Sequence, residues 1–463
     1  MINGAQYIRR ELLIRLVRAF DEGILEEELD RIPIRMRPKD GPSSRCCVYH
    51  DRAVLRYRLI NLLGFSCEEE TDETRSLASY FREAAARTEV NGENPLSACS
   101  AGCSACPDAK IMVTGNCRGC FARPCMYNCP KQAIRIENQT AAVDDSKCVK
   151  CGKCLAVCPF HAIVKTTVPC EEACPVGAIR KDESGKAAID FEKCIFCGKC
   201  FSACPFSAIM ERSQIIDVLT AMKQKEKMIA LVAPSAAAQF PGSIEQLFTA
   251  ISKVGFDDVC EAALGAEKTA ENEAREFQKK MSEKQIFMTT SCCPAYTELV
   301  RKHCPDFLQY VSTTPSPMIF TDRIAREKHP NARTVFIGPC IAKRVEAHRN
   351  GIDFVLSFEE LGAILAGRRI DVIACDPWPL PRPASVHARN FAKSCGVTQA
   401  ILAETDGFDA SFKLDGKFIN GIGKKTLPLL KFYASGKDSL NFLEVMSCEG
   451  GCVNGPTSLT KNG

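Results

Sequence analysis

The chain has 463 residues, of which 46% are hydrophobic and 25% charged, and its formal net charge is +4. It is long enough for two to four domains, and these proportions are those of an ordinary globular protein. The small net charge excludes a strongly basic protein, so neither nucleic acid nor a membrane surface is expected as a partner. No run of 18 or more apolar residues predicts a membrane span, and the N-terminus lacks the apolar core of a signal peptide.

The number of cysteines, 29, is unusual, and seventeen of them lie between Cys99 and Cys204. Because no export signal is expected, disulfide bonds are not expected either, and the protein is assigned to a reducing cytoplasm. Clustered cysteines with short, repeated spacing are typical of iron-sulfur ligation.

Residues 1–95 are predicted to form a helical segment. Apolar residues recur at helical spacing near the N-terminus, and further helices are predicted at 53–63 and 75–86. Cys46 and Cys47, between the first two helices, are interpreted as free thiols, and a partner-docking region is the alternative.

An internal cysteine repeat fills residues 96–212. The motif CxxCxxCxxxCP occurs twice, with its last cysteine at Cys158 and at Cys204. A shorter CxxxCP motif precedes each copy, with its last cysteine at Cys129 before the first and at Cys174 before the second. The gap between paired runs is nearly constant, and the residues after the CP pairs also repeat. This pattern resembles two consecutive copies of a bacterial two-cluster ferredoxin.

In such ferredoxins the last cysteine of each run binds the other cluster. The resemblance implies three 4Fe-4S clusters with the ligand sets Cys117, Cys120, Cys125 and Cys158; Cys148, Cys151, Cys154 and Cys129; and Cys194, Cys197, Cys200 and Cys174. Cys170 and Cys204 remain, and two of Cys99, Cys103 and Cys106 would complete a fourth cluster, although the sequence does not decide which two. A zinc module is the alternative, but zinc sites rarely use the trailing CxxxCP pattern.

Residues 213–463 change to an α/β pattern. Strands are predicted at 228–232, 285–288, 333–337, 353–356, 370–374 and 441–446. Helices predicted at 243–254 and 267–281 alternate with them, which favours mainly parallel sheets flanked by helices.

Three of these strands lead directly into cysteines. The adjacent pair Cys292 and Cys293 follows one strand, Cys340 follows another, and Cys448 and Cys452 follow the last. Because ligands bind beyond the carboxyl ends of parallel strands, this arrangement predicts a metal cluster.

The three motifs resemble the signatures of the iron-only (FeFe) hydrogenases: Thr-Ser-Cys-Cys-Pro at 290–294, Pro-Cys-Ile-Ala-Lys at 339–343 and Glu-Val-Met-Ser-Cys-Glu-Gly-Gly-Cys at 444–452. Their order and spacing agree with the family over roughly residues 96–463. The resemblance implies an α/β fold with three parts. A catalytic domain of two mainly parallel sheets flanked by helices (213–463) follows tandem ferredoxin-like (βαβ) iron-sulfur domains (96–212) and the N-terminal helical segment (1–95).

The family carries an H-cluster, in which a 4Fe-4S cubane is joined to a di-iron unit with CO, CN and a dithiolate bridge. The resemblance implies that Cys293, Cys340, Cys448 and Cys452 bind the cubane and that Cys452 bridges to the di-iron unit. It also implies three to four accessory 4Fe-4S clusters.

Further site residues follow from the same resemblance. Cys292 would be the first protein group in proton transfer, Lys343 and Ser235 would contact the cyanides, and Met446 would pack beside the di-iron unit. Because a cyanide is anionic, a cationic donor such as lysine suits this position.

Glu273 and Glu276 lie three residues apart on a predicted helix and therefore share a face. Together with Ser312 they resemble the proton path of the family. The alternative is a solvated, charged helix face, because other glutamates crowd the same helix.

The resemblance implies reversible reduction of protons to H2, with a ferredoxin-type electron carrier and hydrogenase maturation enzymes as partners. The alternatives are a hydrogen or redox sensor, an iron-sulfur scaffold, and an electron-relay protein. Gly338 replaces a methionine, Met318 replaces a glutamine, and residues 453–456 replace a glycine-rich segment of the best-studied members. The sequence also stops eleven residues after Cys452, without the longer tail of those members. These departures predict a divergent, monomeric, ferredoxin-linked subgroup.

Overall fold

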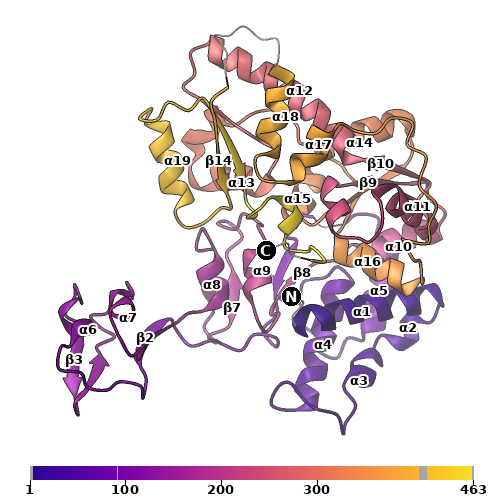
Figure 1. Cartoon of the computed structure of the whole chain (residues 1–463). Helices are drawn as coiled ribbons and strands as arrows, with labels where there is room; N and C mark the ends of the chain where they lie inside the picture. Colours follow the sequence, from indigo (N-terminus) through magenta and orange to yellow (C-terminus); the bar gives the residue numbers. More distant parts are fainter. Residues whose placement is uncertain (1–3, 91, 406–413, 461–463) are drawn as a thin grey trace.

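The structure, a computed structural model, describes residues 4–90, 92–405 and 414–460. The N-terminal segment is a bundle of helices: α1 (Gly4–Asp21), α2 (Leu25–Glu28), α3 (Ile32–Met36), α4 (Val48–Leu62) and α5 (Leu77–Ala86). Leucines of α1 at helical spacing are fully buried, and α1 packs against helix α16 (Phe358–Gly367) of the C-terminal part (Figure 1). The bundle therefore shares a core with the C-terminal region.

Two iron-sulfur units follow the N-terminal bundle. The elements of the first are β2 (Lys110–Val113), α6 (Pro124–Tyr127), β3 (Ile134–Glu137), β4 (Thr140–Val143), α7 (Lys153–Ala156) and β5 (Ile163–Thr166). The elements of the second are β1 (Leu96–Ala98), α8 (Pro169–Ala173), β6 (Ile179–Lys181), β7 (Ala187–Ile189), α9 (Lys199–Ala203) and β8 (Ile209–Glu211). In both units the outer strands pair antiparallel, β2 with β5 and β1 with β8, and so do the inner strands.

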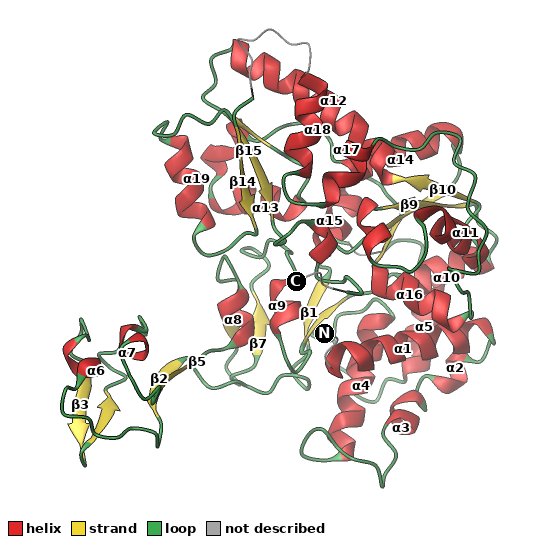
Figure 2. Cartoon of the chain, in the orientation of Figure 1, coloured by secondary structure: helices red, strands yellow, loops and turns green. Residues whose placement is uncertain are grey.

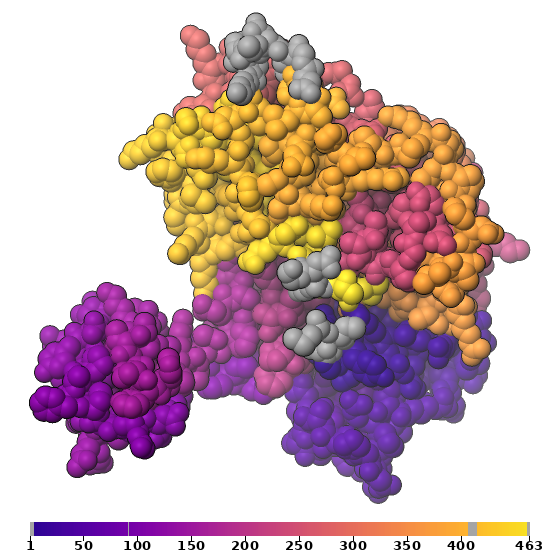
Figure 3. Space-filling view, viewed as in Figure 1, coloured from indigo at the N-terminus to yellow at the C-terminus, as the bar shows by residue number. Residues whose placement is uncertain are grey.

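The two units are nested. Because β1 pairs with β8, the whole first unit lies between β1 and the rest of the second unit. We call residues 107–167 the inserted unit. It projects away from the body of the molecule, at the lower left of Figures 1 and 3, whereas the second unit lies against the C-terminal region.

The C-terminal region, residues 213–463, contains two sheets, and every strand pair in them is parallel. The four-stranded sheet has the order β10 (Asp258–Glu261), β9 (Met228–Val232), β12 (Arg333–Ile337) and β13 (Phe354–Leu356). The three-stranded sheet has the order β11 (Met288–Thr289), β15 (Phe442–Met446) and β14 (Gly416–Asn420).

Helices flank both sheets (Figure 2). They are α10 (Ile215–Lys223), α11 (Ile244–Val254), α12 (Ala262–Ser282), α13 (Pro294–His303), α14 (Pro317–Lys328), α15 (Ala342–Arg349), α16, α17 (Val386–Arg389), α18 (Gly396–Thr405) and α19 (Thr426–Ala434). The short 3-10 turns are Pro234–Ala238, Pro305–Tyr310, Asn390–Ala392 and Cys452–Asn454. Strands β9 and β15 are buried at every position, as expected for parallel strands covered on both faces. The predicted α/β fold with mainly parallel sheets is thereby confirmed.

The strand predicted at 370–374 is wrong, because this segment forms a turn. The Asp371 carboxylate accepts the backbone N–H of Ile373, and Ile373 is 61% exposed. The local hydrogen bond of an aspartate therefore outweighs the apolar run. Among the described residues, no helix is long and apolar enough to span a membrane.

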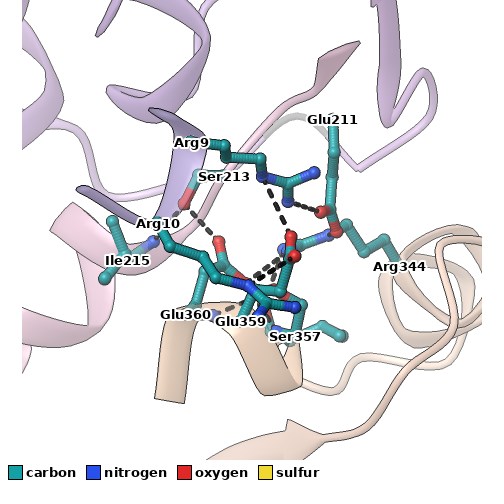
Figure 4. A network of polar contacts seen from close by, with 10 residues as sticks. Arg9, Arg10, Glu211, Ser213, Ile215, Arg344, Ser357, Glu359 and Glu360 are labelled. Carbon is teal, nitrogen blue, oxygen red and sulfur yellow. Dashed lines mark hydrogen bonds and ion pairs between the residues drawn. The ribbon is translucent and has the colours of Figure 1, made fainter. Parts of the chain in front are cut away.

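A buried polar network joins the three parts of the chain (Figure 4). Arg344 of α15 is only 1% exposed and donates hydrogen bonds to Glu211 at the end of β8 (2.8 Å) and to Glu360 of α16 (2.7 Å). Arg9 of α1 donates to the second oxygen of Glu211 (2.5 Å). The N-terminal bundle, the second iron-sulfur unit and the C-terminal region are thus linked by the same buried ion pairs.

Candidate functional site

A cavity of about 90 Å³ lies at the carboxyl ends of both parallel sheets. Pro234 follows β9, Cys292 follows β11, Pro339 follows β12 and Ser447 follows β15, and all four residues line the cavity. In parallel sheets this edge is the one at which ligands bind. We call this space the central cavity.

The central cavity brings the three cysteine motifs together. It is lined by Cys293, Cys340, Cys448 and Cys452, with Cys292 beside them. Burial raises the pKa of the Cys340 thiol, and the neighbouring charges of Cys293 and Cys452 raise it further. Four thiols gathered in a largely apolar cavity would repel one another once ionised, unless a cationic group lay between them. A donor set of this kind fits an iron-sulfur cluster.

Lys343 reaches the same cavity from the first turn of α15. Its ammonium donates to the Ser316 hydroxyl (2.9 Å) and to the Glu346 carboxylate (2.6 Å). Burial tends to lower the pKa of Lys343, but Glu346 and the nearby cysteines outweigh it, so the pKa is raised and the lysine stays charged. The cavity therefore contains a permanent positive charge beside its thiols.

Two buried hydroxyls at the cavity have no hydrogen-bond partner among the residues that the structure describes. They are Ser235 Oγ and Ser447 Oγ, on residues that are 1% and 4% exposed. Because a buried hydroxyl without a partner costs about 1–3 kcal/mol, both are suited to a polar ligand that enters the cavity. Met446 also lines the cavity and supplies an apolar wall.

A chain of titratable groups leads away from Cys292 along α12. Glu273 is fully buried, and its Oε1 accepts the backbone N–H (3.0 Å) and the hydroxyl (3.2 Å) of Ser291. Glu276 lies one turn further and accepts the Ser312 hydroxyl (2.7 Å). The Ser312 hydroxyl also faces Glu273 and thus lies between the two carboxyls.

The two glutamates differ in electrostatics. Burial raises the pKa of Glu273 to about 7. Burial acts in the same direction on Glu276, but hydrogen bonds from Thr313, Ser312 and Thr314 and the charge of Lys280 lower its pKa overall. Glu273 therefore holds its proton up to neutral pH, whereas Glu276 is ionised and has a side chain 13% exposed. Burial raises the pKa of Cys292 as well, and the charge of Glu273 raises it further, so this thiol stays neutral.

Sequence reasoning missed several cavity residues. Ser316 and Glu346 hold Lys343, and the 3-10 turn after α17 contributes Phe391 to the cavity wall. Glu346 lies three residues after Lys343 on a helix, and this spacing would have revealed it. No sequence signal marks Ser316 or Phe391, because only the fold brings Ser316 to Lys343 and Phe391 to the cavity.

Four further cysteine sets lie in the iron-sulfur units. One cavity is lined by Cys117, Cys120, Cys125 and Cys158, a second by Cys129, Cys148, Cys151 and Cys154, and a third by Cys103, Cys106, Cys170 and Cys204. Cys200 interacts with Cys194, Cys197 and Cys174, which form the fourth set. Cys197 of the fourth set also lines the central cavity, so this set adjoins the site.

Each CxxxCP cysteine is followed by the same turn. The third residue after the cysteine has a left-handed φ, at Gln132 (48°), His161 (48°), Gly177 (65°) and Ser207 (53°). This turn directs the next backbone N–H, always that of an alanine, to the cysteine sulfur at 3.1–3.4 Å. N–H···S hydrogen bonds stabilise thiolates and tune cluster potentials, so the repeat is structural as well as sequential.

Cys99 lies apart from the third cavity. It is 1% exposed, and its sulfur accepts the backbone N–H of Gly102 at 3.2 Å. Its thiol faces Cys67, and this contact lowers the pKa of Cys67 to about 7. Of the three candidates that the sequence leaves open, the geometry therefore favours Cys103 and Cys106 as ligands.

Fold and cysteine sets together define an iron-sulfur redox protein. Residues 226–456 match the family described as iron only hydrogenase large subunit, C-terminal domain. Residues 168–208 match a 4Fe-4S dicluster domain, and residues 116–168 match the LdpA Fe-S cluster-binding domain. The chain is a divergent FeFe-hydrogenase-like protein.

Individual relatives are distant. Iron hydrogenase 1 of Clostridium pasteurianum is 26% identical over 405 residues, which cover 76% of this chain and 70% of that protein. The NADP-reducing hydrogenase subunit HndD of Solidesulfovibrio fructosivorans is 25% identical, and the match covers 67% of this chain and 56% of that protein. A structure of the FeFe-hydrogenase HydA1 from Chlamydomonas reinhardtii is 21% identical, with a TM-score of 0.45, over 53% of this chain and 85% of that chain.

Proposed function

We propose that the protein is an FeFe hydrogenase, which interconverts protons and electrons with H2. The observation that carries the proposal is the convergence of three separate sequence motifs on the central cavity, where four cysteines meet Cys292 and Lys343. In this proposal residues 213–463 form the catalytic domain, with iron-sulfur units at 96–212 and the helical segment at 1–95. A ferredoxin-type carrier exchanges the electrons, and hydrogenase maturation enzymes supply the di-iron unit.

The residues of the cavity suit an H-cluster. Cys293, Cys340, Cys448 and Cys452 would hold its cubane, with Cys452 bridging to the di-iron unit. When bound, the di-iron unit would supply the open iron site at which the H–H bond is made or broken. The orphaned buried hydroxyl of Ser235 would donate to one of its anionic ligands.

Lys343 and Met446 would complete the surroundings of the H-cluster. The charge of Lys343 would stabilise an anionic cyanide in an apolar cavity, where a charge-assisted hydrogen bond is strong. Ser316 and Glu346 already fix the ammonium, so little side-chain entropy remains to be lost. Met446 would pack beside the di-iron unit and exclude water from it.

The proton would travel along α12. Cys292 would exchange a proton with the site and then with Glu273, whose raised pKa of about 7 matches proton exchange at neutral pH. The Ser312 hydroxyl would carry the proton between Glu273 and Glu276, and Glu276 would exchange it with solvent. The order of burial along this chain, from fully buried Glu273 to partly exposed Glu276, supports a path from the cavity to the surface.

Electrons would travel through the accessory clusters. The set that contains Cys197 adjoins the central cavity and would hold the cluster next to the cubane. The set formed by Cys103, Cys106, Cys170 and Cys204 would follow in the same unit, and the two sets of the inserted unit would lie furthest out. We therefore propose four accessory 4Fe-4S clusters.

The decisive experiment is anaerobic reconstitution with iron and sulfide followed by addition of the di-iron precursor. Infrared bands of protein-bound CO and CN together with hydrogen turnover are expected. Absence of those bands after reconstitution would refute the hydrogenase and leave an electron-relay protein. Bands with negligible turnover would identify a sensor.

The role of Cys292 can be tested separately. Cys292→Ala is expected to keep the CO and CN bands and to lose most of the turnover, because the cluster ligands are intact but the first proton carrier is gone. Cys260→Ala removes a thiol outside the proposed site and is the matched control. Wild-type turnover in Cys292→Ala would contradict the relay.

A further inference from the structure

The inserted unit, residues 107–167, is set apart from the body of the molecule. Figures 1 and 3 show it as a separate lobe. The antiparallel strand pair β2–β5 lies between this lobe and the body of the molecule (Figure 2). At its base Lys181 of the second unit pairs with Asp108. The two cysteine sets of this lobe therefore lie away from the catalytic region, and Cys151 of the second set is exposed.

The net positive charge of the chain is concentrated in the lobe. Residues 107–167 contain nine lysines and arginines and four aspartates and glutamates, whereas the whole chain has a net charge of only +4. The second unit, residues 168–212, contains six lysines and arginines and seven aspartates and glutamates. Both units have two cysteine sets, so the negative charge of bound clusters would be the same in each. Cluster binding alone therefore does not account for the basic character of the lobe.

The unpaired cations lie at the cysteine sets. Arg118 borders the cavity of Cys117, and Lys131, Lys150 and Lys153 border that of Cys148. All four basic side chains are exposed, and none of them forms an ion pair with any residue that the structure describes. We call these four residues the basic rim.

Exposed apolar side chains accompany the basic rim. Phe121, between two cysteines of the first set, is fully exposed, and Tyr127 on α6 is 78% exposed. Val149 (57%) and Phe160 (45%) border the two cavities. Aromatic rings that are left in water beside unpaired charges are typical of protein interaction sites, in which a buried ring anchors the contact.

We propose that the inserted unit is the docking site of an acidic, one-electron carrier protein of the ferredoxin type. The basic rim would steer the acidic partner, and Phe121 and Tyr127 would anchor it next to the cysteine sets. A small, electrostatically steered contact suits a carrier that must bind and leave at every electron transferred. The inference rests on the proposed function for the class of partner, but its test needs no hydrogen chemistry.

The experiment uses the full chain reconstituted with iron and sulfide only, so that no di-iron unit is present. The oxidised protein is mixed in a stopped-flow instrument with an acidic, pre-reduced two-cluster ferredoxin, and cluster reduction is followed by visible absorption. The wild-type second-order rate constant is expected to fall steeply with ionic strength. The triple variant Lys131→Glu, Lys150→Glu and Lys153→Glu is expected to react about tenfold or more slowly at low salt.

Two comparisons separate docking from damage to the clusters. Reduction by the small methyl viologen cation radical is expected to be as fast or faster in the triple glutamate variant, because the rim is now negative. A control triple variant with glutamate at three exposed lysines of the catalytic region, Lys279, Lys284 and Lys425, is expected to keep the wild-type rate with ferredoxin. Phe121→Ser is expected to slow the ferredoxin reaction at high and low salt alike.

A milder triple variant, with glutamine in place of the three rim lysines, shows whether misfolding of the glutamate variant explains its slower reaction. It is expected to react with ferredoxin more slowly than the wild type while keeping the wild-type viologen rate. The proposal is overturned if this variant reacts with ferredoxin at the wild-type rate, or if the control triple variant is slowed as much as the rim variant. Hydrogen turnover of the fully matured protein is measured independently, so failure of the docking site and failure of the hydrogenase are distinguishable.

Discussion

Glu273→Gln tests whether the proposed proton path contains a carboxyl that stays neutral at physiological pH. Burial raises the pKa of Glu273 from its ordinary 4.5 to about 7. At 1.36 kcal/mol per pKa unit, this difference corresponds to about 3 kcal/mol. Glutamine has nearly the same shape, donates and accepts hydrogen bonds and does not titrate.

The sign of the effect follows from proton binding. Between pH 4.5 and 7 the unfolded chain has lost the Glu273 proton, whereas the folded protein keeps it. The folded state therefore binds more protons, and the free energy of unfolding falls as the pH rises through this window. Glu273→Gln removes that loss, so the variant is expected to exceed the wild type by less than about 1 kcal/mol at pH 5 and by up to about 3 kcal/mol at pH 8.

The assay is anaerobic differential scanning calorimetry of both reconstituted proteins at pH 5 and pH 8. For a domain of this size about 1 kcal/mol shifts the unfolding midpoint by roughly 2–4 °C, so the pH-dependent difference is readily measured. Glu276→Gln is the matched control and should act in the opposite direction. Its lowered pKa stabilises the fold above the ordinary value of 4.5, and the variant loses that contribution at pH 8. An equal midpoint difference between Glu273→Gln and the wild type at both pH values would refute the reasoning.

Three further substitutions have defined outcomes. Cys103→Ser is expected to lower the iron content by about four atoms per chain relative to the wild type, whereas Cys99→Ser should keep it, as measured by iron analysis after reconstitution. Arg344→Met leaves Glu211 and Glu360 buried without their cation and should cost about 3–5 kcal/mol of stability in a denaturant titration, whereas Arg82→Met, at the exposed pair with Glu26, should cost less than about 1 kcal/mol. Gly338→Met would place a Cβ 2.6 Å from the Phe336 ring, so it should lower the unfolding midpoint, and Phe336→Leu in the same chain should restore part of the loss.

The surroundings of Gly338 leave little room for a side chain. A side chain at this position would meet Phe336 and, at 3.3 Å, the Cβ of Ala233. Phe336 itself lines the central cavity, so the ring occupies space near the site that a neighbouring side chain would otherwise fill. A methionine at position 338 would therefore need the Phe336 ring to move.

The sequence could predict the parts of the site that depend on spacing along the chain. The strands at 228–232 and 333–337 were predicted to the residue, because continuous apolar runs identify buried parallel strands. The cysteine motifs identified the family, and the comparison with known proteins confirms it. The ligand roles, the proton path and the accessory clusters stay predictions until the experiments above are done.

The sequence could not predict contacts between distant segments. The nesting of the two iron-sulfur units depends on the pairing of β1 with β8, which lie more than 100 residues apart. The same is true of Arg9, which reads as a solvent-facing residue of an amphipathic helix yet lies against Glu211. Strand pairing and ion pairs over such separations are set by the whole fold, and local periodicity contains no information about them.

The adjacent residues Cys292 and Cys293 show how the fold could separate the two routes that a hydrogenase needs. Cys293 faces the other cavity cysteines and, beyond them, Cys197 of the second iron-sulfur unit, whereas Cys292 faces Glu273 on α12. Both thiols line the central cavity, and Pro294 starts α13 directly after the pair, so both routes begin at the same turn. A one-residue slip of β11 against β15 would displace both thiols, so this register helps to set which cysteine would carry electrons and which would carry protons.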